Sequence, residues 1–157
     1  MSLSRIILAV TLAAVATVAA AQEKRPGYGP AITTAMAKKI AAGVVAECQK
    51  NGWNVAVAVV DPHGSLVYYE RMEDTQYSSS DIAILKAKSA ATYRRPTRAF
   101  ADVINKGGPA TATLPNAIGS PGGVPIFVDG KIIGAVGASG VTGDQDEQCS
   151  IAGTKSM

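Results

Sequence analysis

Two apolar runs flank the dipeptide Asp129-Gly130, and this feature restricts the fold of the chain more than any other. The runs cover residues 124–128 and 131–138 and are rich in β-branched side chains. Asp-Gly between two such runs is typical of a two-residue turn, because both residues accept the positive φ angles that this turn requires. The sequence therefore predicts an antiparallel β-hairpin in the C-terminal part of the chain.

A second hairpin is predicted near the middle of the chain. Residues 54–60 form a short, valine-rich apolar run, which is typical of a strand that is covered on both faces. The segment Asp61-Pro62-His63-Gly64 has the residue types of a type I turn, and residues 65–71 follow as a second strand. We expect residues 54–60 to lie in the centre of the sheet.

Four helices are predicted around these strands. Apolar side chains recur at every fourth position from Ile32 to Cys48, which indicates an amphipathic helix ending near Gly52. Three further helices follow: one capped by Ser78–Ser80 and running to about Tyr93, one capped by Thr97 and closed by Gly107, and one opened by the capping box Thr142-x-x-Gln145. The Gly- and Pro-rich connection 108–123 contains at most a short extended piece at 114–118, and a functional loop is expected there.

The N-terminus has the pattern of a secretory signal. Arg5 provides a positive start, residues 6–18 are almost entirely apolar, and Ala19-Ala20-Ala21 resembles a cleavage site. A retained anchor is the alternative, but the apolar run is shorter than the roughly 20 residues that cross a bilayer. We expect a signal peptide at 1–21, a flexible lead-in at 22–30 and one domain at 31–157, in a periplasmic or secreted protein with no membrane contact after cleavage.

Charge and cysteine content exclude some classes of function. The net charge of +3 is far below that of a nucleic-acid-binding domain, so no nucleic-acid partner is expected. Cys48 and Cys149 are the only cysteines, and their spacing matches no metal-binding motif. In an oxidising compartment they form either a disulfide, worth about 4 kcal/mol, or two buried free thiols.

Several segments together resemble the GlcG/HbpS-like family, which also occurs as the C-terminal domain of PduO-type proteins. They are VVDPHGSLV (59–67), KAKSAATYRRPT (86–97), GGVPI (122–126), DG (129–130), IGAVG (133–137) and DQDE (144–147). The resemblance extends over nearly all of residues 32–152, with the segments in the family's order. It implies an α/β (α+β) profilin-like fold, in which a mostly antiparallel sheet of about five strands is flanked by helices and the chains form homo-oligomers.

The resemblance also implies a disulfide and a class of ligand. The first and last helices of the family lie on the same sheet face, which favours pairing of Cys48 with Cys149. Some members bind haem or its degradation products, and others are associated with corrinoid or glycolate operons.

The most distinctive cluster of charged side chains lies in the family-like segment 86–97 and just beyond it. Lys86, Lys88, Arg94, Arg95 and Arg98 concentrate positive charge there, and arginine donates paired hydrogen bonds to carboxylates such as haem propionates. The alternatives are a solvated surface or salt bridges between subunits. The resemblance favours an anion site.

His63 is the only histidine, so a His-Asp-Ser triad or a multi-histidine metal site would have to be built around it, and its position in a tight turn argues against both. It is either an exposed turn residue or an axial ligand of haem iron. Other residues with iron-ligating side chains are Tyr68, Tyr69, Tyr77, Tyr93, Met36 and Met72, for which core or interface packing is the alternative.

Glycines and acidic residues near the C-terminus allow further interpretations. The segment 119–123 can present backbone N–H groups to an anion, but it is no P-loop, because no Lys-Ser/Thr follows it. Gly134, Gly137 and Gly140 indicate close backbone approach to a ligand or to a neighbouring subunit. Asp144, Asp146 and Glu147 either bind a cation or stabilise the start of the last helix.

These observations favour an exported, homo-oligomeric protein that binds a small anionic ligand, with haem or a related tetrapyrrole as the expected cofactor. The predicted site consists of Lys88, Thr92, Tyr93, Arg94, Arg95, Gly122, Gly123, Pro125 and Asp146, with His63 as the candidate iron ligand. The alternatives are an enzyme that acts on a small organic acid or degrades haem, and an assembly or regulatory module without a ligand.

Overall fold

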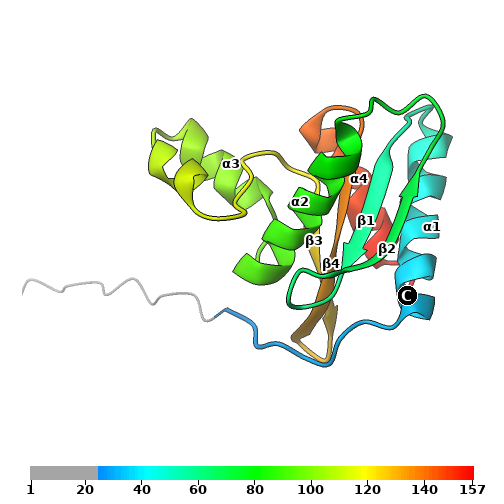
Figure 1. Ribbon diagram of the computed structural model, residues 1–157, viewed down its shortest axis with the longest axis horizontal. Coiled ribbons are helices and arrows are strands. Elements are labelled where there is room, and N and C mark those ends of the chain that lie inside the picture. Colours follow the sequence, from blue (N-terminus) through cyan, green and yellow to red (C-terminus); the bar gives the residue numbers. More distant parts are fainter. Residues whose placement is uncertain (1–24) are drawn as a thin grey trace, which may run out of the picture.

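The computed structural model describes residues 25–157, so the predicted signal peptide lies outside the described residues. Along the chain it contains α1 (Thr34–Lys50), β1 (Ala56–Val60), β2 (Leu66–Arg71), α2 (Ser79–Tyr93), α3 (Arg98–Asn105), the 3₁₀ helix η1 (Pro109–Thr113), β3 (Gly123–Val128), β4 (Lys131–Ser139) and α4 (Gly143–Thr154) (Figure 1). None of these helices has the length and apolarity that crossing a membrane requires.

The strands form one antiparallel sheet in the order β2-β1-β4-β3. Both predicted hairpins, β1–β2 and β3–β4, are present, and Asp129 and Gly130 have φ angles of 50° and 72° in the second turn. Every residue of β1 is buried, as its unbroken apolar run predicts. The sequence thus predicted the centre of the sheet correctly.

Helices cover both faces of the sheet. On one face α1 and α4 pack side by side, and on the other α2 crosses β1, β4 and β3 (Figure 1). The α2 face is lined by small residues, including Ala58, Ala83 and Ala87. A Cβ on Gly137 would collide with the backbone of Ala83 and Ala87, so this glycine lets helix and strand meet within one chain. The close approach expected at Gly137 is therefore neither to a ligand nor to another subunit.

The sheet has four strands in the described residues, where about five were expected. The extended piece predicted at 114–118 is an irregular loop after η1 and pairs with no strand. Pro115 lacks the N–H that a strand ladder needs, and Asn116 has a φ of 59°, which is left-handed backbone. Instead of strand pairing, the carbonyl of Pro115 accepts a hydrogen bond from the Tyr93 hydroxyl at 2.7 Å.

Two of the predicted helix caps differ from expectation. Ser78 and Thr97 precede α2 and α3 but make no side-chain capping hydrogen bond. The Thr97 hydroxyl instead accepts a bond from the Gly123 amide at 3.0 Å, because β3 runs directly past it. The capping box at the start of α4, formed by Thr142 and Gln145, is present as predicted.

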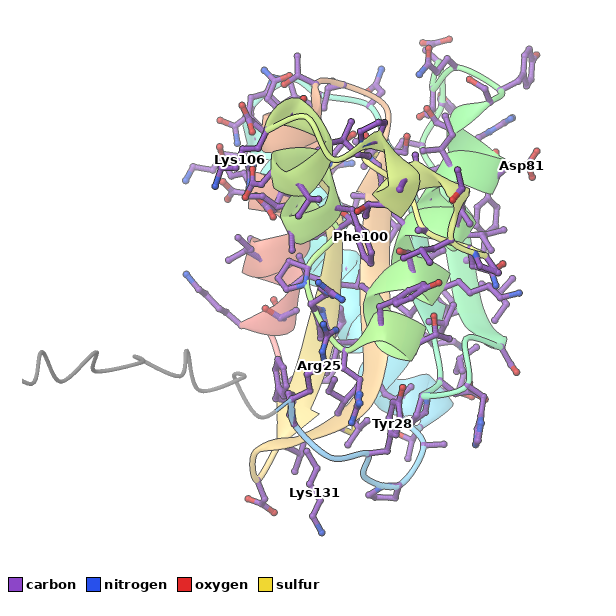
Figure 2. All side chains as sticks on the ribbon, turned by 90° about the vertical axis from the view of Figure 1, so that its left-hand side faces the viewer. Arg25, Tyr28, Asp81, Phe100, Lys106 and Lys131 are labelled. Carbon is purple, nitrogen blue, oxygen red and sulfur yellow. A yellow bond between two sulfur atoms is a disulfide. The ribbon has the colours of Figure 1, made fainter. Side chains whose placement is uncertain are left out.

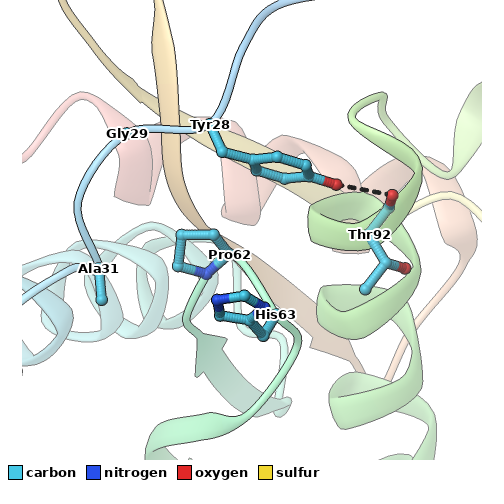
Figure 3. A pocket seen from close by; sticks show the side chains of 6 residues that line it. All are labelled: Tyr28, Gly29, Ala31, Pro62, His63 and Thr92. Atoms are coloured by element: carbon cyan, nitrogen blue, oxygen red, sulfur yellow. Dashed lines mark hydrogen bonds between the residues drawn. The ribbon is translucent and has the colours of Figure 1, made fainter.

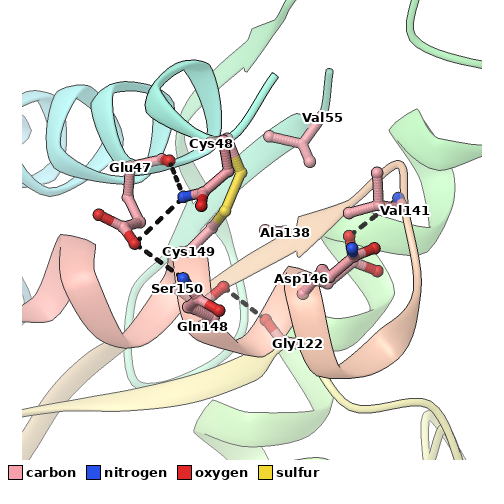
Figure 4. Close-up of a disulfide and its surroundings, with 12 residues drawn as sticks. Glu47, Cys48, Val55, Gly122, Ala138, Val141, Asp146, Gln148, Cys149 and Ser150 are labelled. Atoms are coloured by element: carbon pink, nitrogen blue, oxygen red, sulfur yellow. Dashed lines mark hydrogen bonds between the residues drawn. A yellow bond between two sulfur atoms is a disulfide. The ribbon is translucent and has the colours of Figure 1, made fainter. Parts of the chain in front are cut away.

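A disulfide joins α1 to α4 (Figure 4). Cys48 and Cys149 are fully buried, and their Cα atoms are 5.6 Å apart. Beside them the Gln148 amide donates a 2.8 Å hydrogen bond to the Glu47 carboxylate, which links the same two helices at the surface. The structure contains no free cysteine among the residues it describes.

Residues 25–31, called the strap below, run past the end of the β3–β4 hairpin before α1 begins (Figure 1). The sequence predicts a flexible lead-in at 22–30, but the described part of it is bonded to β4. The Gly29 amide donates to the Ile132 carbonyl at 2.8 Å, and the Ile132 amide donates to the Gly27 carbonyl at 2.9 Å. Main-chain bonds hold the strap, although its glycines and prolines offer little apolar surface.

Candidate functional site

A recess of about 290 Å³ opens between the strap, the β1–β2 turn and the C-terminal end of α2. It is lined by Tyr28, Gly29, Ala31, Pro62, His63 and Thr92 (Figure 3). His63 and Thr92 belong to the predicted site, and the structure brings them together from segments almost thirty positions apart in the sequence. This recess is the candidate functional site.

The strap forms one wall of the recess through Tyr28. Its hydroxyl donates a 2.9 Å hydrogen bond to the Thr92 carbonyl at the end of α2, drawn as a dashed line in Figure 3. The last carbonyls of a helix lack partners within the helix, so this bond satisfies one of them. Tyr28 is 46% exposed and lines the recess, so it is accessible to a ligand there.

The β1–β2 turn forms the opposite wall. The Asp61 carboxylate accepts hydrogen bonds from the amides of His63 and Ser65, at 2.8 and 2.9 Å, which fixes the turn. Pro62 is buried, whereas His63 is exposed and borders the recess. Figure 3 shows the Tyr28 ring on one side and the rings of Pro62 and His63 on the other. The recess therefore lies between side chains that carry rings, two of which, Tyr28 and His63, are aromatic.

Lys88 lies beside this turn. A Cβ on Gly64, whose φ is 87°, would come within 2.8 Å of the Lys88 Cγ and 3.3 Å of a Thr92 methyl group. The turn is therefore packed against α2, with the half-buried Lys88 stem next to the residue that follows His63. Of the predicted cations, Lys88 is one that the fold brings close to the recess.

Two arginines contribute positive charge at the same end of α2. The Arg94 guanidinium lies 5.4 Å from the centre of the Tyr28 ring and donates to the Pro26 carbonyl at 3.2 Å. Arg25 donates to the Tyr93 carbonyl at 2.7 Å, and Figure 2 shows Arg25 and Tyr28 at the same end of the molecule. Cations are favoured there, because the C-terminal end of a helix carries partial negative charge.

Tyr93 and Arg95 of the predicted site pack toward α3 and the loop after η1. The rings of Tyr93 and Phe100 meet edge to face, with centres 5.1 Å apart, and the Arg95 guanidinium lies 4.9 Å from the centre of the Phe100 ring. Burial lowers the pKa of Arg95, with a further contribution from the charge of Arg25. Among residues 25–157, the buried Arg95 Nε atom has no hydrogen-bond partner.

Asp146 of the predicted site forms a buried ion pair with Lys86. The Lys86 ammonium lies 2.7 Å from the Asp146 carboxylate and 3.1 Å from the Ala138 carbonyl, to which it also donates. The second carboxylate oxygen of Asp146 accepts a hydrogen bond from the Val141 amide at 3.2 Å. Burial lowers the pKa of Lys86 and raises the pKa of Asp146, because water no longer solvates either charge.

Gly122, Gly123 and Pro125 lie next to this ion pair or in β3. A Cβ on Gly122 would approach the Lys86 ammonium and the Asp146 Cβ to 2.9 Å, so glycine leaves room for the pair. Gly123 is packed against the Lys86 backbone, and Pro125 is buried opposite Ala135 in the sheet. These predicted ligand contacts are packed against the chain itself, and none of them lines the recess.

Arg98, another predicted cation, forms ion pairs with two acidic residues at the surface of α4. Arg98 pairs with Asp144 at 2.6 Å and makes a short contact with Glu147, which ties α3 to α4. Both hydrogen bonds raise the pKa of Arg98. Within residues 25–157, no cluster of three or more acidic, histidine or cysteine side chains is arranged to hold a metal ion.

Sequence reasoning missed the strap residues, above all Tyr28. They stand in a Gly- and Pro-rich stretch without apolar periodicity, so nothing local predicts where they pack. The only available signal was an aromatic residue and an arginine within a segment otherwise rich in glycine and proline.

A family model described as haem degrading protein HbpS-like matches residues 32–155. The chain belongs to the HbpS-like family. The HbpS-like match begins just after the strap, so the wall that contains Tyr28 lies outside the matched residues. His63 and Thr92 lie inside them.

Known relatives agree with this assignment to the HbpS-like family. Protein GlcG of Escherichia coli strain K12 is 43% identical over 104 residues, which cover 66% of this chain and 78% of GlcG. The crystal structure of Klebsiella pneumoniae ORFY is 29% identical with a TM-score of 0.74, covering 87% of this chain and 99% of ORFY. A PduOC–haem complex is 26% identical with a TM-score of 0.74, covering 81% of this chain and 95% of PduOC.

Proposed function

We propose that this protein binds haem or a related planar, anionic tetrapyrrole in the recess between Tyr28 and His63. One observation carries the proposal: the only histidine of the chain faces a recess whose other wall is an aromatic ring with an arginine beside it. The HbpS-like family description and the PduOC–haem complex support this class of ligand.

The residues of the recess suit the parts of haem. Tyr28, Ala31 and Pro62 offer apolar surface to a macrocycle, and the His63 imidazole is a usual axial donor to iron. Lys88 and Arg94 stand nearby as partners for propionate groups. Because the recess is smaller than a whole tetrapyrrole, it accommodates one edge of the ring. When bound, haem supplies a redox-active iron centre.

The test is a titration of the mature protein with haemin, followed through the Soret band. We expect a saturable Soret shift at micromolar protein. His63→Ala should change the Soret position and weaken haemin binding about tenfold, which corresponds to about 1.4 kcal/mol. Lys39→Ala, on the exposed side of α1, is the control and should bind like the wild type.

The two negative outcomes have different meanings. A wild-type protein without a saturable Soret shift overturns the proposed function. An unchanged spectrum of His63→Ala removes His63 as iron ligand and leaves tetrapyrrole binding in place.

We further propose that the protein is exported and assembles as a homo-oligomer. The Cys48–Cys149 disulfide supports an oxidising compartment, as does the N-terminal pattern of Arg5 and the apolar run at 6–18. Mass spectrometry of protein recovered from the periplasm or medium should find an N-terminus near Gln22. Light scattering of the same preparation tests the homo-oligomer, and the mass of a single chain would contradict it.

A further inference from the structure

We propose that the strap and the end of α2 together form a binding element: Tyr28 of the strap contacts the face of a porphyrin ring, and Arg94 at the end of α2 pairs with one of its carboxylates. Recognition through these two residues does not need iron. The inference rests on the proposed function and deepens it, since it names the chemical parts of the ligand that Tyr28 and Arg94 contact.

The first observation is the fixed position of the Tyr28 ring. Its hydroxyl is bonded to Thr92 at the end of α2, so the ring is held across the recess from the His63 turn (Figure 3). Nearly half of the surface of Tyr28 remains exposed. Aromatic faces stack on other flat ring systems, and a pre-positioned ring loses little conformational freedom when a ligand binds.

The second observation is the backbone of Arg94. This residue ends α2 with a φ of 56° and a ψ of 41°, a left-handed conformation that helices commonly give to glycine at this position. An arginine in this backbone conformation is strained relative to glycine, but it places a guanidinium group beside the recess. That guanidinium lies over the Tyr28 ring, and within residues 25–157 no carboxylate forms an ion pair with it. Its remaining donors suit an acidic group of a ligand.

The third observation separates the Tyr28 ring from the folding of the strap. Main-chain hydrogen bonds hold the strap to β4 at Gly29 and Gly27, and the Ile32 amide donates to the Ile133 carbonyl at 2.8 Å. None of these bonds involves the Tyr28 side chain. Replacing that side chain therefore tests the ring while the strap backbone keeps its own anchors.

The experiment compares haemin with metal-free protoporphyrin IX on the mature protein, using absorption for the first and porphyrin fluorescence for the second. We expect both to saturate the wild type. Tyr28→Ala should weaken both about tenfold, whereas Tyr28→Phe, which keeps the ring, should stay within about threefold. Tyr77→Ala is the matched control, since Tyr77 is 83% exposed and does not line the recess.

His63→Ala completes the design. It should weaken haemin but leave protoporphyrin IX unchanged, because the metal-free ring has no iron for an imidazole to ligate. Circular dichroism and the unfolding midpoint of each variant show whether it is folded.

Each remaining outcome decides between the two proposals. Binding of haemin without binding of protoporphyrin IX overturns the strap inference and leaves the proposed function standing. Equal affinity of Tyr28→Ala and wild type for protoporphyrin IX has the same meaning. A wild type that binds neither probe overturns both.

Discussion

The ammonium of Lys86 lies 2.7 Å from the carboxylate of Asp146, and both side chains are almost completely buried between α2 and α4. From the sequence these residues belong to a cationic cluster and to a charged helix start. In the structure they satisfy each other, with the Ala138 carbonyl and the Val141 amide as further partners. The pair therefore joins two helices on opposite faces of the sheet.

Removal of one partner of this pair should be strongly destabilising. Lys86→Met leaves the Asp146 carboxylate buried without its counter-ion, and the free energy of unfolding should fall by about 3–5 kcal/mol. The double variant Lys86→Met/Asp146→Leu should regain most of that loss, because no charge remains buried. Urea unfolding measures both, with Lys39→Met as the exposed control. A loss below about 1 kcal/mol for Lys86→Met contradicts the buried pair.

The disulfide should account for a large part of the stability. Its two cysteines are 101 positions apart, and closing a loop of that length is worth about 4 kcal/mol when the bond is unstrained. Urea unfolding with and without reductant should differ by roughly that amount, and Cys48→Ala/Cys149→Ala should be insensitive to reductant. Thiol titration of the unfolded, unreduced mature protein should find none, and two thiols would refute the bond.

Arg94→Gly should separate folding from binding. Glycine adopts the left-handed backbone without the steric cost that an arginine has there, and this gain offsets the lost guanidinium contacts. Urea unfolding should place Arg94→Gly within about 1 kcal/mol of the wild type and Arg94→Ala lower than Arg94→Gly by about 1 kcal/mol. Haemin affinity should fall in both variants. Wild-type affinity in Arg94→Gly would show that no ligand carboxylate uses this arginine.

Gly137→Ala should push α2 away from the sheet. The added methyl group would collide with the Ala83 carbonyl and lie 2.6 Å from the Ala87 nitrogen, both main-chain atoms that cannot rotate aside. We expect a loss of about 3 kcal/mol or more in urea unfolding. Gly27→Ala is the control, because a methyl group added there would meet nothing within 4 Å and its effect should be small. Equal stability of the two variants would contradict this packing.

Tyr68 should give the protein a pH-dependent signal in the alkaline range. Its hydroxyl donates to the Glu70 carboxylate at 3.1 Å, and this bond raises the pKa of Tyr68. A raised pKa in the folded state contributes stability that is present below the ordinary tyrosine pKa, about 10, and is lost as the pH rises through the raised value. The phenolate absorbance should show one tyrosine that ionises at a higher pH than the others. In Glu70→Gln the pH midpoint of that tyrosine should be lower. An unchanged titration in Glu70→Gln would contradict the assignment.

Local chemistry explains which parts of the fold were predictable. Three short sequence signals each specify backbone geometry within a few residues, and all three occur as expected. They are the turn Asp129-Gly130, the turn Asp61-Pro62-His63-Gly64 and the Thr142–Gln145 capping box. The family-like order of segments indicated the remaining architecture. The predicted fifth strand failed at Pro115 and Asn116, whose backbone preferences oppose a ladder.

The site was less predictable, because it depends on contacts between distant segments. His63 and Thr92 were both predicted site residues, and they lie together because the hairpin turn packs on α2. Tyr28 was missed because its position comes from main-chain bonds to Ile132, more than a hundred positions away. The ion pair between Asp146 and Lys86 was not predicted, because the sequence does not show that these two side chains are buried beside each other.

Pro125 lies in β3, the outermost strand on its side of the described sheet, and the pairing with β4 shifts register just beyond it. The unpaired edge of such a strand is a template to which strands of other chains can add, and this leads to aggregation. Proline offers no N–H to an incoming strand. The register shift also bends the edge of the sheet, so that a flat strand from another chain pairs with it less well. Concentrated protein should therefore resist fibre formation along β3, even though Phe127 and Val128 expose apolar surface there.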